Sequence, residues 1–204
     1  MVSPLWLERG RLSGTQYTPE KGWDENKLDF FRRHIVQLGR SGLFVVYDEL
    51  VGKEPVEWNY LLHTVELPME VAEEKDGLRI LGKNKADGVS IAHLFSSQKM
   101  TYAQTDTFFV AAVDWKKRLG KTLSNHYHFT ATTASCSKIC FLNVIDVHGN
   151  NRADAVINRE RNRITVEEWV IECNLEGEGN AFLYIENKPV SYTHLRAHET
   201  SQDL

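Results

Sequence analysis

The sequence predicts an all-β fold, a large two-layer antiparallel β-sandwich that is truncated relative to its parent. From residue 29 onward, short β-type runs alternate with turn residues at the spacing of a sandwich or barrel. No long segment has helical periodicity. The strand-like runs are also more numerous than a minimal sandwich needs, and the first begins without a natural leader. Both features are expected of a broad sheet cut from a longer chain.

A hairpin is the clearest predicted element in the first third of the chain. Leu43–Val51 is its first strand, the turn sequence GKEP follows at Gly52–Pro55, and Val56–Val65 is its second strand. Side chains of the second strand alternate, with Trp58, Tyr60 and Leu62 on one face and Glu57, Asn59 and His63 on the other. This alternation is typical of a half-buried antiparallel strand, so Trp58 and Tyr60 are expected in the core.

The rest of the chain continues as strand-like runs separated by turn signals. Asp-Gly dipeptides at residues 76–77 and 87–88 favour tight hairpin turns. The alternation changes parity around Glu167 and Glu168, which predicts a β-bulge there. The further predicted strands are Met69–Glu73, Leu78–Lys83, Val89–Phe95, Met100–Thr105, His126–Thr133, Ile139–His148, Ile164–Val166, Trp169–Leu175 and Ala181–Glu186.

One antiparallel β-sandwich domain is expected over residues 30–188, because a chain of 204 residues can bury one good core. Residues 1–29 are rich in Gly, Pro and polar residues and are expected to be a loop-rich remnant of a preceding region. Residues 114–124 (DWKKRLGKTLS) indicate a basic surface loop. Apolar residues make up 42% of the chain, which is too many for a disordered protein.

Charge and cysteine content narrow the function classes. The net charge of −4 leaves no basic field that would gather nucleic acid from a distance. Residues 1–10 lack the pattern of a signal peptide, and no apolar run approaches the ~20 residues of a membrane span. The three cysteines, Cys136, Cys140 and Cys173, lack the spacing of a zinc ribbon or a disulfide framework, so buried thiols are expected.

Residues 189–204 are expected to be a non-native tail. The decapeptide SYTHLRAHET at residues 191–200 resembles the conceptual translation of a transposon-type sequencing adapter. Ser201–Leu204 fit the reading frame that would follow such an adapter. The two histidines of this stretch, His194 and His198, therefore carry no functional argument.

Three stretches of the chain follow one another in a recognisable order and spacing. They are FFRRHIVQLGRSGLFVVYDEL at Phe30–Leu50, EWNYLLHTV at Glu57–Val65 and NHYHFTATT at Asn125–Thr133. Together they resemble the C-terminal β-sheet region of the heparinase II/III-like polysaccharide lyases. The resemblance extends from Phe30 to about Glu186, which is most of the chain before the tail.

The resemblance implies a larger enzyme, in which an N-terminal α/α toroid precedes the sandwich and uronate-containing acidic polysaccharides are broken by β-elimination. Glycosaminoglycan and alginate substrates fit equally well. The reaction needs a base, a Tyr or His for the leaving oxygen, and donors for the developing enolate. The resemblance places these groups, and a zinc or calcium site, upstream of residue 1. No catalytic residue is therefore carried over, and no cofactor is expected in this chain itself.

The resemblance also implies a periplasmic or secreted protein whose partners are an acidic polysaccharide and its own toroid domain. The alternative function belongs to a different class, a stand-alone carbohydrate-binding or structural β-sandwich module. The reading frame upstream of Met1 would separate the two, because a helical toroid encoded there favours the lyase.

His126 and His128 are the candidate metal ligands. They alternate with Tyr127, so on a strand both imidazoles face one side at a spacing compatible with metal ligation. A third ligand would have to come from another strand, and the candidates are His63, His93 and Asp146. Hydrogen-bonded cross-strand pairs are the competing interpretation, which the pattern favours.

Arg32 and Arg33 interrupt an otherwise apolar strand. Arginine can bind a carboxylate or a sulfate through two parallel hydrogen bonds. Asp48 and Glu49 lie on the neighbouring predicted strand, so an internal ion pair is favoured over a substrate contact.

Trp115, Lys116 and Lys117 are the candidate contacts for an acidic sugar. An aromatic side chain in a loop, followed by two cations, offers a stacking surface and a counter-charge together. A solvated charge run is the competing interpretation of the same residues.

Overall fold

The computed structural model describes residues 28–39, 42–64, 67–106, 126–149 and 151–188. Every regular element in these ranges is a β-strand, and every strand pair is antiparallel. The predicted all-β antiparallel sandwich is confirmed. The strands are β1 (Leu28–Leu38), β2 (Leu43–Val56), β3 (Asn59–Thr64), β4 (Glu70–Glu74), β5 (Gly77–Lys83), β6 (Gly88–Ser96), β7 (Met100–Thr105), β8 (Tyr127–Thr133), β9 (Cys136–Gly149), β10 (Ile157–Glu160), β11 (Arg163–Val166), β12 (Trp169–Cys173) and β13 (Leu183–Asn187).

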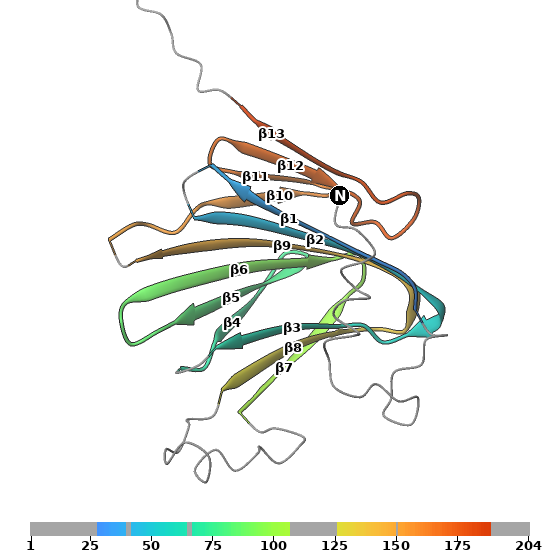
Figure 1. Ribbon diagram of the computed structural model, residues 1–204, viewed down its shortest axis with the longest axis horizontal. Coiled ribbons are helices and arrows are strands. Elements are labelled where there is room, and N and C mark those ends of the chain that lie inside the picture. The colour runs from blue at the N-terminus through green and yellow to red at the C-terminus, as the bar shows by residue number, and fades with distance from the viewer. Residues whose placement is uncertain (1–27, 40–41, 65–66, 107–125, 150, 189–204) are drawn as a thin grey trace, which may run out of the picture.

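The strands form three sheets (Figure 1). The central sheet has six strands in the order β1-β2-β9-β6-β5-β4, and the other two are a four-stranded sheet, β10-β11-β12-β13, and a three-stranded sheet, β3-β8-β7. In Figure 1 the four-stranded sheet lies above the central sheet and the three-stranded sheet below it. In these described ranges no helix is long and apolar enough to cross a membrane.

Alternating side chains of β9 show that the two smaller sheets cover opposite faces of the central sheet. Leu142 packs in one core cluster with Ile171 of the four-stranded sheet. Its neighbour Phe141 packs in a second cluster with Tyr60 and Phe129 of the three-stranded sheet. Adjacent residues of a strand point to opposite faces, so β9 is covered on both sides. This explains its nearly continuous apolar sequence.

The predicted hairpin between Leu43–Val51 and Val56–Val65 is wrong. β2 runs on through the expected turn to Val56, and its register against β9 is irregular between Val51 and Val56. β3 pairs with β8 in a different sheet, so the chain crosses from one layer to another between β2 and β3. The glycine and proline of GKEP are accommodated because this part of β2 is irregular.

The β-bulge predicted at Glu167 and Glu168 is also wrong, because these residues form a hairpin turn. Val166 of β11 pairs directly with Trp169 of β12, and Glu167 adopts a φ of 50°. The two-residue loop lets Val166 and Trp169 face the same side, which produces the parity change seen in the sequence. β10 lies outside the predicted strands, since its sequence INRE has only one apolar residue.

The internal ion pair expected between Arg32 or Arg33 and the acidic residues of the neighbouring strand is confirmed, and it joins Arg33 to Asp48. Arg33 Nε and Nη2 donate to Asp48 Oδ1 and Oδ2, each over 2.6 Å, across the β1–β2 pair. The Asp48 side chain is 2% exposed and that of Arg33 is 45% exposed. The hydrogen bond to Asp48 raises the pKa of Arg33. Glu49 pairs instead with Lys138, whose Nζ lies 3.5 Å from Glu49 Oε1.

The core positions expected from the sequence are also confirmed. Tyr60 is buried, and Trp58 packs beside it while its indole Nε1 donates to the Cys136 carbonyl over 2.9 Å. The three cysteines are free thiols, with Cys140 and Cys173 buried and Cys136 half-buried. Burial raises the pKa of Cys173 to about 12.

Candidate functional site

A cleft of about 730 Å³ opens between the central sheet and the three-stranded sheet. Its floor is formed by β5, β6 and β9, and the end of β3 provides one wall. This volume lies within the range of small-molecule sites, about 300–1,000 Å³. The apolar part of the lining comprises Leu62, Met69, Ile80, Val89, Ala92, Ile145 and Val147.

Small side chains on the floor explain why the two sheets leave space here. Gly82 pairs with Ser90 across β5 and β6, and Ala92 faces the three-stranded sheet beside them. A Cβ atom added at Gly82 would lie 3.2 Å from Thr64 Cγ2, so β3 passes close to this strand. The bulkier core residues farther along these strands fill the space between the layers. The sandwich therefore opens at this end.

Lys83 and Lys85 border the cleft, as does His63 at the end of β3, and none of the described lining residues carries a carboxylate. Lys83 Nζ lies 3.3 Å from Glu70 Oε1, but both side chains are exposed and such a pair is weak. The cleft thus combines an apolar floor with positive charge, a combination suited to a ligand that carries carboxylates or sulfates.

The turn between β5 and β6 places the two lysines. Asn84 Oδ1 accepts hydrogen bonds from the backbone N–H groups of Ala86 and Gly88, over 2.9 and 2.8 Å. Asp87 adopts a left-handed φ of 61°, as the Asp-Gly signal predicts. These local bonds order the turn that carries Lys85, so the lysines are presented on a fixed backbone.

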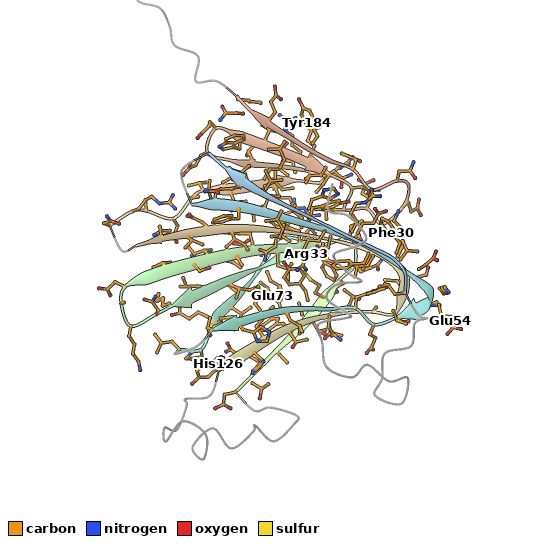
Figure 2. The ribbon with its side chains drawn as sticks, viewed as in Figure 1. Phe30, Arg33, Glu54, Glu73, His126 and Tyr184 are labelled. Carbon is orange, nitrogen blue, oxygen red and sulfur yellow. The ribbon has the colours of Figure 1, made fainter. Side chains whose placement is uncertain are left out.

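The histidines of β3 and β8 lie beside this cleft. His63 and His128 face each other in register, with their ring centroids 4.7 Å apart and their planes nearly perpendicular. Partial burial lowers the pKa of His63, and His128 and His126 lower it further. In Figure 2, His126 lies at the end of β8, where the chain enters the three-stranded sheet.

The structure brings His126 and His128 together with one of the three proposed third ligands, His63. His93 and Asp146 lie on the opposite face of the central sheet, where His93 Nδ1 is 3.0 Å from Glu74 and Asp146 pairs with Arg152. In the parts of the chain that the structure describes, no three His, Cys, Asp or Glu residues are placed to hold a metal ion. Metal binding by His126 and His128 stays a prediction.

The three candidate sugar contacts, Trp115, Lys116 and Lys117, lie outside the described residues. Their segment joins the described chain at Asp106 and His126. The β7–β8 register pairs Thr105 with His128, so both junctions lie at the same end of the three-stranded sheet as His63.

Lys83 and Lys85 are the site residues that sequence reasoning missed. The segment KNKADG at residues 83–88 holds both lysines before an Asp-Gly turn, and this was the available signal. Its connection to a cleft depends on Gly82, Ser90 and Ala92, which come from two strands. Their small size is informative only once the strand pairing is known.

The chain matches no protein-family model and no curated protein. Among solved structures, it is similar to a heparinase III gene product, with a TM-score of 0.47 and 13% sequence identity over 76% of this chain. A form of that protein with methylated lysines gives a TM-score of 0.41, also at 13% identity over 76% of this chain. In both comparisons the alignment spans only 23% of the other protein. A likeness of this size carries no argument about function.

Proposed function

We propose that this chain is the β-sandwich part of a polysaccharide lyase that cleaves uronate-containing acidic glycans, and that the sandwich binds such a glycan at the basic cleft. The single observation that carries the binding part is the border of the cleft, where Lys83 and Lys85 lie and no described residue carries a carboxylate. Uronates and sulfates are anionic along the whole polymer, so even a modest positive site gains from repeated contacts.

The resemblance of three sequence stretches supports the lyase part of the proposal. Two of them, Glu57–Val65 and Asn125–Thr133, contain strands that pair with each other, with Leu62 opposite Phe129. The third, Phe30–Leu50, contains the β1–β2 pair with its buried Arg33–Asp48 contact. These stretches thus contain strand pairs that form part of the framework of the sandwich.

β-Elimination requires removal of the proton α to the uronate carboxylate and stabilisation of the resulting enolate. In this proposal the base, the group that handles the leaving oxygen and a zinc or calcium ion belong to an α/α toroid domain. The sandwich adds a surface that keeps the acidic chain in place between cleavage steps. Trp115, Lys116 and Lys117 are proposed as further glycan contacts, and a periplasmic or secreted location is part of the same proposal.

Binding is tested with the 204-residue chain by calorimetric titration with heparan sulfate and with alginate at about 50 mM salt, where charge contacts are little screened. Lys83→Gln with Lys85→Gln should weaken binding at least about tenfold, equivalent to about 1.4 kcal/mol. Lys53→Gln with Lys75→Gln removes the same charge from exposed positions away from the cleft and is the matched control. Equal effects of the two double variants would refute the site.

The lyase reaction is tested with the protein encoded by the complete gene. Incubation with the same acidic glycans should generate the ultraviolet absorbance of an unsaturated uronate. Cleavage without this chromophore would indicate hydrolysis and contradict the proposal. A reading frame that encodes no helical toroid upstream would favour the stand-alone module instead.

The domain limits form part of the proposal, with residues 30–188 as the sandwich domain and residues 189–204 as a non-native tail. A chain that ends at Lys188 should unfold at the same urea concentration as the 204-residue chain. A clear loss of stability would show that the tail residues belong to the fold.

A further inference from the structure

Two large aromatic side chains lie exposed side by side on the four-stranded sheet, far from the basic cleft. Phe182 is 49% exposed and Tyr184 is 52% exposed. The residues between and beside them, Ala181, Leu183 and Ile185, pack against the core. Phe182, directly before β13, and Tyr184 within it therefore point to the same outer side, and Tyr184 points to the outside of the molecule in Figure 2.

Hydrogen-bonding groups flank the aromatic pair in a defined order. Glu172 of β12 lies directly opposite Tyr184, and Arg163 of β11 lies directly opposite Glu172. Arg163 Nη1 donates to Glu172 Oε1, so these two charged groups hold each other in place. The row across three strands thus presents a guanidinium, a carboxylate and a phenol ring on one flat face.

This face differs in charge from the basic cleft. Its described charged residues are Glu160, Arg163, Glu172, Glu186 and, directly after β13, Lys188, three carboxylates against two cations. An acidic glycan would be repelled by this excess of negative charge. A neutral sugar meets no such cost, and its hydroxyl groups can both donate to the carboxylates and accept from Arg163.

We propose that the outer face of β11–β13 binds a neutral polysaccharide, with Phe182 and Tyr184 as the stacking surface and the Arg163–Glu172 pair as the hydrogen-bonding group. The C–H bonds on the flat face of a pyranose ring pack on an aromatic ring, which removes apolar area from water on both partners. The two rings, two residues apart in sequence, contact successive parts of one polymer. The basic cleft and this face then bind glycans of opposite charge character.

The test is native electrophoresis of the 204-residue chain through gels containing hydroxyethylcellulose, xylan or galactomannan. At least one of these should retard the chain, and Tyr184→Ala and Phe182→Ala should each weaken that retardation about tenfold, or about 1.4 kcal/mol. Tyr184→Trp should preserve or strengthen it, because the larger ring still stacks. Ile35→Ala is the matched control, since Ile35 is 65% exposed on β1 of the central sheet and should leave retardation unchanged.

Three results would overturn the proposal. They are no retardation by any of the three glycans, retardation that Tyr184→Ala leaves unchanged, and a concentration-dependent dimer that Tyr184→Ala dissociates. The last result would assign this face to a second copy of the chain. Circular dichroism of each variant separates loss of binding from loss of folding. The outcome is independent of the acidic-glycan titration, because the cleft lysines belong to a different pair of sheets.

Discussion

The buried ion pair between β1 and β2 gives a sharp prediction about stability. Arg33→Met keeps much of the aliphatic stem of the side chain but removes both hydrogen bonds to Asp48. The Asp48 carboxylate is then left in the interior without its cation. Asp48→Asn is the opposite change, and it leaves a guanidinium that is half exposed and can be solvated.

The structure predicts which of the two substitutions lowers the free energy of unfolding more. Removing one partner of a buried pair costs about 3–5 kcal/mol, and the half-exposed guanidinium of Arg33 places Arg33→Met at the lower end, about 3 kcal/mol. Asp48→Asn leaves no unpaired charge in the interior and keeps one acceptor oxygen. We therefore expect the free energy of unfolding to fall by about 1–2 kcal/mol. With a urea m-value of about 2 kcal/mol/M, the midpoints shift by about 1.5 M and about 0.5–1 M.

Urea unfolding monitored by tryptophan fluorescence measures both losses. Glu49→Gln is the matched control, because it weakens a longer contact to Lys138 on the other face of β2 and should cost about 1 kcal/mol or less. The reasoning is refuted if Arg33→Met costs no more than this control. It is also refuted if Asp48→Asn proves the more damaging of the two changes.

Three further predictions concern the glycine, cysteine and histidine positions. Gly42→Ala should lower the free energy of unfolding by about 2–4 kcal/mol in a urea titration, because φ is 80° there and the added Cβ would collide with the Val147 carbonyl oxygen; a loss below about 1 kcal/mol would contradict this. In the folded chain Cys136 should be alkylated before Cys173, because Cys173 is buried and burial raises its pKa to about 12. Mass spectrometry measures the two alkylation rates, which should become equal when the chain is unfolded in urea. The pKa of His63 is lowered on folding, so its contribution to stability is full above the ordinary pKa of about 6.5 and is lost as the pH falls below that value through the lower pKa of the folded chain. His63→Ala should therefore make urea midpoints less dependent on pH below about pH 6.5.

The alternation of polar and apolar residues predicted the strands well, because successive side chains of a strand point alternately to the core and to solvent. Tyr60 and Leu62 face the core and Asn59 and His63 face outward, as the sequence of β3 indicates. The pairing of strands could not be predicted in the same way. GKEP has the composition of a turn, yet β2 continues across it, and β9, from a distant part of the chain, pairs with β2 on both sides of it, at Val51 and at Val56.

The candidate site shows the same division between local and distant information. The Arg33–Asp48 pair was predictable because both residues belong to one hairpin of consecutive strands. The basic cleft was not, since it requires β5, β6 and β9 on one side and β3 on the other. The Asp-Gly turn after Lys83 and Lys85 indicates a tight turn in the sequence but not that a cleft lies beside it.

Asn143, a polar residue in the largely apolar strand β9, connects the strand topology with the cleft. Asn143 is fully buried in β9, and its Nδ2 donates to the Tyr60 hydroxyl over 3.2 Å, across to the three-stranded sheet. A slip of β9 by one residue would turn Asn143 toward the apolar face that meets the four-stranded sheet, at the cost of an unsatisfied amide. Ile145 has the same parity as Asn143 and lines the cleft. The Asn143–Tyr60 hydrogen bond, together with the buried Asp146–Arg152 pair on the opposite face, therefore favours the register that places Ile145 on the cleft floor.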